Sequence, residues 1–214
     1  MSWITTLKNE MDITGNLEKD VESFYKHFNA LPLFLHSVDV AEECRNLANL
    51  FHTNEKNAHI TGYLHDISSV IPKENIMEAV LDLNIAVLPE ETQFPYLLYQ
   101  KLSAALAQEL FQIDNKEVLS ALECHTTLKK KCKKQDLILF VADKIKWGKI
   151  GNPPYIAAIH MEWQKSLEHA AYCYITYVWE RRNQYQVIHP WLIEAYYDLK
   201  EKLEISFSSE NDTK

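Results

Sequence analysis

The stretch Gly62-Tyr63-Leu64-His65-Asp66-Ile67 places an imidazole and a carboxylate on adjacent residues, directly after a short apolar run. Alone this doublet is weak evidence, because an adjacent His and Asp occur by chance in many chains and usually lie on the surface. Here the chain also carries His36 upstream of the doublet, and His125 and Asp143 downstream of it. The doublet looks like half of a metal site, and the order His, His-Asp, Asp is specific.

The composition is that of an ordinary globular protein. The chain has 214 residues, of which 47% are hydrophobic and 24% charged, enough for one large domain or at most two. A formal net charge of -8 argues against a nucleic-acid surface, which would need clustered Lys and Arg. The basic run at 129–134 is interpreted as a solvated loop, with a phosphate-binding patch as the alternative because it follows His125.

The cysteines and the N-terminal segment indicate the cellular setting. The four cysteines form no CxxC pair, so neither a thiolate zinc site nor a disulfide scaffold is indicated. The N-terminal segment lacks an apolar signal region, and no run approaches the roughly 18 apolar residues of a spanning helix. We therefore expect a soluble cytoplasmic protein that does not enter a membrane.

Only four glycines and the absence of convincing alternating runs predict an all-α chain. A first helix is expected over 17–28, and a second begins just after His36 because Pro32 breaks the pattern. The next helix ends around Leu64, which leaves the His-Asp doublet at its C-terminal end.

Downstream, Pro72 suits the first turn of a helix that turns Leu81 inward and stops at Leu88-Pro89. Further helices are expected over 98–111, 114–125 and 135–147. Asp143 then lies mid-helix among apolar neighbours, where a carboxylate needs a cation or a hydrogen-bond partner.

From Pro153 onward the chain is dense in aromatic residues. Their spacing favours core or interface packing over a stacking platform for bases. Arg181 and Arg182 are expected to cap the helix that carries most of them. Residues 206–214 are predicted to be a flexible tail.

The metal-site pattern resembles the HD superfamily of metal-dependent phosphohydrolases, whose helical domain collects its ligands from separate helices in this order. The likeness covers roughly residues 30 to 150. His125-Thr126-Thr127 and Phe140-Val141-Ala142-Asp143-Lys144-Ile145 are similar to the bacterial branch that cleaves diadenosine tetraphosphate symmetrically. Members of that branch are often linked to NAD metabolism. The resemblance implies an HD-domain helical bundle over 1–150. A helical extension over 151–205 is expected to pack on it, because its aromatic series would otherwise expose too much apolar surface.

The resemblance also implies the ligand set. His36, His65, Asp66 and Asp143 would hold one divalent metal, and His125 would be either a ligand of a second metal or a phosphate contact. A mixed nitrogen and oxygen sphere suits iron or manganese. Such a metal lowers the pKa of bound water from roughly 15.7 to about 7 and neutralises charge on a phosphoryl oxygen. Asp66 and His125 are the candidate catalytic residues.

Two positions depart from the family pattern. The family usually places a His at the position of Tyr99, where it helps to hold a second metal, and tyrosine is a poor ligand at its usual pKa of about 10. A Lys that commonly follows the Asp by three residues is replaced by Ser69. The candidate substrate-binding residues, three of which could supply the missing charge, are Thr126, Lys101, Lys144 and Lys149.

The most specific function that the resemblance implies is symmetrical hydrolysis of diadenosine tetraphosphate to two ADP, with a nucleotide polyphosphate as the partner. The alternative is a degenerate HD protein that binds metal and nucleotide as a sensor with little turnover, which Tyr99 and Ser69 support. The aromatic extension would serve as a homodimer interface or as a lid. Without a Walker loop, GxGxxG or GxSxG elbow, kinase, dehydrogenase and serine-hydrolase functions are disfavoured.

Overall fold

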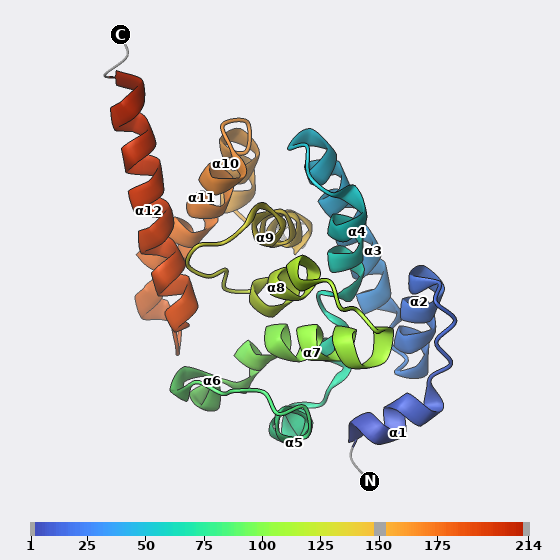
Figure 1. Cartoon of the computed structure of the whole chain (residues 1–214). Coiled ribbons are helices and arrows are strands. Elements are labelled where there is room, and N and C mark those ends of the chain that lie inside the picture. Colours follow the sequence, from blue (N-terminus) through green and yellow to red (C-terminus); the bar gives the residue numbers. More distant parts are fainter. Residues whose placement is uncertain (1–2, 148–152, 212–214) are drawn as a thin grey trace.

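The computed structural model describes residues 3–147 and 153–211 (Figure 1). Within these ranges the chain forms twelve α-helices and four short 3-10 helices, and no strand occurs, which confirms the all-α prediction. In chain order the elements are α1 (Trp3–Glu10), α2 (Leu17–His27), α3 (Leu31–Leu50), α4 (Glu55–Leu64), η1 (Ile67–Val70), η2 (Lys73–Asn75), α5 (Ile76–Asp82), α6 (Pro89–Gln93), η3 (Pro95–Leu98), α7 (Tyr99–Phe111), α8 (Lys116–Cys124), α9 (Lys134–Trp147), α10 (Tyr155–Glu162), α11 (Leu167–Glu180), η4 (Arg182–Gln184) and α12 (Pro190–Asn211).

Helix α9 lies at the centre of the bundle (Figure 1). Every residue over 135–145 is buried, and α9 contacts α3, α4, α8, α10 and α11. A helix that is buried on all sides, as α9 is over this stretch, is one that a large core encloses. Asp143 therefore enters the interior of the protein on a helix whose whole middle section is shielded from water.

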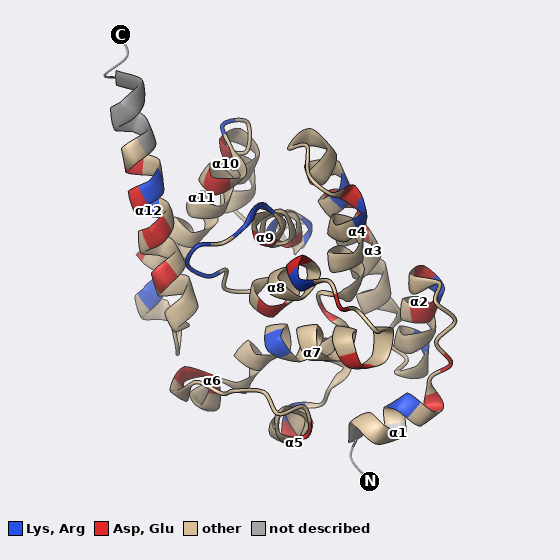
Figure 2. Cartoon of the chain, in the orientation of Figure 1, with Lys and Arg blue, Asp and Glu red and all other residues tan. Residues whose placement is uncertain are grey.

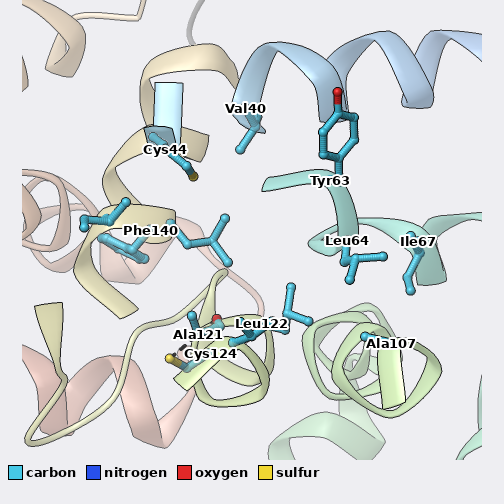
Figure 3. Packing of buried hydrophobic residues seen from close by; sticks show 14 of the residues in the cluster. Val40, Cys44, Tyr63, Leu64, Ile67, Ala107, Ala121, Leu122, Cys124 and Phe140 are labelled. Atoms are coloured by element: carbon cyan, nitrogen blue, oxygen red, sulfur yellow. Dashed lines mark hydrogen bonds between the residues drawn. The ribbon is translucent and has the colours of Figure 1, made fainter. Parts of the chain in front are cut away.

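The core joins the helices that carry the predicted site residues. Figure 3 shows buried side chains of α3, α4, α8 and α9 meeting in one cluster, among them Val40, Leu64, Leu122 and Phe140. Each fully buried Leu or Phe side chain contributes about 1.5–3 kcal/mol. This packing fixes the relative positions of four helices before any ligand binds.

Gly62 permits an unusually close approach of α4 to α3. A Cβ atom added at Gly62 would lie 2.2 Å from Ala41 Cα and 2.5 Å from Ala41 N. Only a residue without a side chain fits there. The approach brings the rings of His36, on α3, and His65, at the end of α4, to a centroid distance of 5.2 Å.

Two helix boundaries differ from the sequence prediction, and proline is the reason in both cases. Helix α3 begins at Leu31 rather than after His36, with Pro32 in its first turn, where the missing N–H is not needed. His36 thus lies in the second turn of a continuous helix. Helix α5 already ends at Asp82, and Pro89 begins α6 instead of stopping a helix.

The inward position predicted for Leu81 is also wrong. Its side chain is 77% exposed, because the short α5 turns Ile76, Ala79 and Val80 to the core instead. The helices predicted over 98–111, 114–125 and 135–147 are confirmed to within a few residues as α7, α8 and α9.

The aromatic residues of α11 and α12 pack against one another. The rings of Trp179 and Tyr196 stack at 4.8 Å with an interplanar angle of 18°. Arg181 Nη1 donates to Tyr177 O, and Arg182 Nη1 donates to Trp179 O, as expected of cations at a helix C-terminus. Helix α12 continues to Asn211, so the tail predicted from residue 206 begins within a helix, and its last three residues lie outside the described ranges.

The lysine-rich run at 129–134 connects α8 to α9 (Figure 2). Lys129 Nζ donates to Ser120 O, and the backbone N of Lys131 donates to Asp198 on α12. Two members of the run are therefore engaged by neighbouring helices. Among the described residues, no helix has both the length and the hydrophobicity that crossing a membrane requires.

Candidate metal centre

His65 occupies the C-cap of α4, whose N-terminus is capped by the side chain of Asn54. Its Nδ1 lies 2.8 Å from Gly62 O. Because a carbonyl only accepts, Nδ1 carries the proton, and the lone pair is left on Nε2, as in histidines that ligate metals. The side chain is 0% exposed, and its Nε2 has no hydrogen-bond partner. Buried polar atoms normally have a partner. A buried nitrogen without one is the state expected of a metal-ligating atom whose cation is not bound.

The structure brings all five predicted metal ligands together. His36 Nε2 and His65 Nε2 each lie 3.6 Å from Asp143 Oδ1. His65 Nε2 lies 3.4 Å from Asp66 Oδ2, and His125 Nε2 lies 3.6 Å from Asp66 Oδ1. Ligand atoms about 2.0–2.2 Å from a common metal are themselves roughly 3–4 Å apart. These separations are longer than those of good hydrogen bonds and lie in the range expected of neighbouring ligands around a cation.

The tightest group consists of His36, His65 and Asp143, whose ligand atoms all lie within 4.8 Å of one another. His36 Nε2 is also buried without a hydrogen-bond partner. Two imidazole nitrogens and a carboxylate form the mixed donor set that suits iron, manganese and other first-row divalent ions.

Asp66 lies between two imidazoles. One of its oxygens faces His65 and the other faces His125. His125 Nδ1 lies 2.9 Å from Leu122 O and carries the proton, so Nε2 is the ring nitrogen that holds the lone pair. Burial alone would raise the pKa of the Asp66 carboxyl, but His65 and His125 hold it well below its usual range. Asp66 is thus an ionised, partly buried carboxylate at the wall of the protein's interior.

Asp143 is shared between the histidines and a lysine. Lys144 Nζ donates to Asp143 Oδ2 at 2.5 Å and to His125 O at 3.3 Å. Burial alone would raise the pKa of Asp143, but Lys144 and His36 lower it below its usual range. Burial would likewise lower the pKa of His65, but Asp66 and Asp143 raise it to about 9. The cluster thus favours positive charge, and a metal would compete with a proton for His65.

A cavity of about 540 Å³ opens over this cluster. Asp66, His125 and Asp143 line it, together with two of the predicted substrate-binding residues, Thr126 and Lys144. A cavity that places ionised carboxylates and a free imidazole nitrogen beside an ammonium group has the parts required for metal-assisted chemistry on a phosphate.

Lys101 lies elsewhere, which corrects its assignment to the substrate. Its ammonium group donates to Glu91 Oε2 at 2.8 Å and to Ala86 O at 2.9 Å, and it lines a different cavity. The buried carboxylate of Glu91 requires a partner of opposite charge, and Lys101 is that partner. Lys149, the remaining candidate, lies outside the described residues.

The two positions that depart from the family pattern both line the site cavity. The Tyr99 hydroxyl donates to Ile71 O at 2.8 Å. Burial, together with Tyr96 and Glu74, raises the pKa of Tyr99, which keeps the phenol neutral and a poor ligand. Ser69 adds no charge, so Lys144 is the lysine that the structure places beside the cluster.

Gln100 is a positioning residue that the sequence reasoning missed. It is fully buried on α7, and its Oε1 accepts hydrogen bonds from the backbone N of Thr126 and of Thr127, each at 3.2 Å. It thereby fixes the turn that follows His125. A glutamine among the apolar residues of 98–111 was the available signal, since a buried amide needs partners.

The fold and the cluster together define a helical protein with a site for a divalent metal. The HD domain family matches residues 33–148, more than half of the chain. The chain therefore belongs to the HD domain family and is an HD-superfamily phosphohydrolase, a class that binds divalent metals.

Several proteins are similar to the chain in sequence. An "uncharacterized protein in pepC 5'region" of Lactococcus lactis subsp. cremoris is 39% identical over 150 residues, 70% of this chain and 76% of the relative. A Staphylococcus aureus protein named "bis(5'-nucleosyl)-tetraphosphatase, symmetrical" is 27% identical over 116 residues, 53% of this chain and 58% of the relative. A Mycoplasma genitalium "probable nicotinate-nucleotide adenylyltransferase/Ap4A hydrolase" is 26% identical over 113 residues, 52% of this chain and 31% of the relative.

A solved structure shares the fold. It is a protein of Clostridium acetobutylicum described as a "predicted HD superfamily hydrolase involved in NAD metabolism", with a TM-score of 0.79 and 22% sequence identity. The likeness covers 86% of this chain and 97% of the other. It therefore includes helices beyond the end of the family match at residue 148.

Proposed function

We propose that the protein hydrolyses nucleotide polyphosphates, most specifically diadenosine tetraphosphate to two molecules of ADP. The observation that carries the proposal is the pair of buried nitrogens, Nε2 of His36 and of His65, which have no hydrogen-bond partner and lie beside Asp143 and Asp66. This donor set fits one divalent metal, with iron or manganese preferred. His125 is the residue through which a second metal would bind.

The chemistry divides between the metal and the chain. A divalent cation at this cluster supplies an acidified water and charge neutralisation at a phosphoryl oxygen. Asp66, held ionised between two imidazoles, would orient the attacking water. His125 Nε2, the ring nitrogen that does not face Leu122 O, would accept its proton. Water adds to a central phosphorus, the bond to the middle bridging oxygen breaks, and one ADP leaves.

Lys144 is the residue proposed to bind the phosphate chain. Its ammonium group lies 5.1 Å from the ring centroid of Phe140 and 5.7 Å from that of Tyr174, in addition to its contact with Asp143. Aromatic faces stabilise a cation without neutralising it. Lys144 can thus contact a phosphoryl oxygen in the cavity while its stem stays fixed. Tyr174 belongs to α11, so the helical extension takes part in the site.

The name of the Staphylococcus aureus relative supports the choice of substrate. The test is an assay of diadenosine tetraphosphate with manganese or ferrous iron, comparing wild type with Asp66→Asn and with the surface control Tyr197→Ala. We expect ADP as the product, a loss of at least about 100-fold in Asp66→Asn, and no change in the control. Formation of ATP and AMP would contradict symmetrical cleavage.

The alternative of a sensor with little turnover is favoured by one observation. Tyr99 lines the cavity with a neutral phenol engaged to Ile71, where the family has a histidine. If Tyr99 has removed the second metal, Tyr99→His should raise both activity and the number of bound metals from one to two. A wild-type protein that binds nucleotide but cleaves no polyphosphate would establish the sensor function instead.

A further inference from the structure

Two partly exposed aromatic rings border the same cavity as the metal cluster. Trp147, the last residue of α9, is 59% exposed, and Tyr96, in η3, is 41% exposed. Both line the 540 Å³ cavity. Aromatic rings contribute most to stability when they are buried, and Tyr172 and Trp179 of α11 both stack on Tyr196 of α12. The rings at the cavity instead leave much of their surface to water.

Trp147 is tied to the metal cluster by its position on the helix. It follows Asp143 by four residues on α9, which places the two side chains on the same helix face. Its ring centroid lies 6.0 Å from that of His36, at an interplanar angle of 80°. The two rings are thus close and nearly perpendicular, and a flat group bound beside the metal cluster would meet the indole.

Tyr96 offers an aromatic ring with a cation beside it. Its ring lies 5.4 Å from that of Phe94 and 5.7 Å from that of Tyr99, and Lys73 Nζ lies 5.3 Å from its centroid. A planar ring beside an ammonium group matches the chemistry of a nucleotide, in which an aromatic base and a phosphate are joined by a sugar.

We infer that Trp147 and Tyr96 are the base-stacking residues of the site, each contacting one nucleobase of a substrate that carries a base at both ends of its phosphate chain. The inference rests on the proposed function for the identity of that substrate. Stacking needs only the flat face that every base presents. The site should therefore prefer dinucleoside polyphosphates to bare phosphate chains and discriminate weakly between adenine and guanine.

The test is equilibrium binding, measured by calorimetry with manganese present. The first probe is a diadenosine tetraphosphate analogue whose central bridging oxygen is replaced by methylene, so that it cannot be cleaved there. The second probe is methylenediphosphonate, which carries no base. The proteins are wild type, Trp147→Ala, Trp147→Phe, Tyr96→Ala and, as a matched control away from the cavity, Tyr197→Ala.

Each alanine variant at the cavity should bind the analogue about 5- to 150-fold more weakly, the range that loss of one base–aromatic stack gives. Trp147→Phe should recover part of the loss, and Tyr197→Ala should match wild type. Binding of methylenediphosphonate should change less than about twofold in all of them, because the metal centre is intact. The metal content of each variant is measured alongside.

Three results would overturn the inference: no binding of the analogue to wild type, no effect of either alanine variant, or an equal weakening of both probes. The last would mean that the rings act through the metal centre. If the variants show the expected binding pattern but wild type cleaves no diadenosine tetraphosphate, the proposed function is removed and the stacking role stands. Brisk cleavage of diadenosine tetraphosphate by wild type, together with unchanged binding of the analogue in the alanine variants, would support the proposed function and remove the stacking role.

Discussion

Two of the clusters of buried charged and polar side chains in the described part of the chain differ in how far their groups are paired. In the first, Glu91 accepts hydrogen bonds from Leu88 N at 2.7 Å, from Lys101 Nζ at 2.8 Å and from His189 Nε2 at 3.2 Å. His189 Nδ1 in turn accepts from Trp191 N at 3.1 Å. In the second, His36 and His65 each leave a buried Nε2 without a hydrogen-bond partner.

The difference distinguishes a structural cluster from a functional one. Lys101 and His189 both pair with Glu91, so we call these three residues the self-paired cluster. This cluster joins α6 and α7 to the segment that begins α12. The His65 cluster gathers groups that satisfy one another only in part, which costs stability unless a ligand completes them. Burial and charge are common to both, so incomplete pairing is the property that points to a metal.

The largest effect is expected where the metal cluster depends on helix packing. Gly62→Ala would place a Cβ atom 2.2 Å from the backbone of Ala41, so α3 and α4 must separate. We expect a loss of at least about 3 kcal/mol in the free energy of unfolding, or no folded protein. Gly15→Ala is the control, since nothing lies within 4 Å of it and only its φ of +86° adds strain. Equal denaturation midpoints for the two variants would contradict the packing account.

The second prediction breaks the self-paired cluster. Glu91→Ala removes the carboxylate that neutralises Lys101 in the interior, and it should lower the free energy of unfolding by about 3–5 kcal/mol. The metal content of the protein that remains folded should equal that of wild type, because Glu91 does not line the metal cavity. A variant as stable as wild type in urea denaturation would show that the pair contributes little.

These two predictions separate what the sequence reveals from what it cannot reveal. The five candidate metal ligands came from the resemblance to the HD superfamily, which rests on their residue types and their order along the chain, and the structure brings their side chains together. Lys101 was misassigned, because its partner Glu91 lies on a different helix, α6, and only the folded chain brings the two together. Gln100 was missed for the same reason: its hydrogen bonds to Thr126 and Thr127 join distant segments.

The helix positions were predictable where apolar periodicity was long, as over α7 and α9. They were not predictable where a proline admits two interpretations. Pro32 lies in the first turn of α3 and Pro89 begins α6, and a proline that starts a helix has the same local sequence signal as one that stops the preceding helix. Packing of the flanking residues decides between them.

The third prediction concerns metal removal. A ligand that binds only the folded state stabilises it by about 2.7 kcal/mol at a free concentration 100 times its Kd. With manganese supplied at that excess, a chelator should lower the melting temperature of wild type and of Lys101→Met, in which the self-paired cluster is altered. It should leave that of His65→Ala unchanged. A chelator effect on His65→Ala as large as on wild type would place the metal elsewhere.

The smallest effect is a pH dependence in the Glu91 cluster. Burial alone would raise the pKa of Glu91, but His189 and Lys101 lower it below its usual value. A carboxyl with a lowered folded-state pKa stabilises the protein above its unfolded pKa of about 4.3, and this contribution is lost as the pH falls through the folded pKa. The difference in unfolding free energy between wild type and Glu91→Gln should therefore be full at pH 7 and shrink below about pH 4. A difference that grows on acidification would reverse the sign of the argument.

The most direct measurement is the metal content of the two kinds of variant, determined by elemental analysis of purified, folded protein. The account predicts at least one equivalent of iron or manganese in wild type and in His189→Ala, whose histidine belongs to the self-paired cluster. It predicts none in His65→Ala, whose histidine leaves a buried Nε2 without a hydrogen-bond partner. Equal metal in His65→Ala and His189→Ala would contradict the assignment of the metal to the His36, His65, Asp66 and Asp143 cluster.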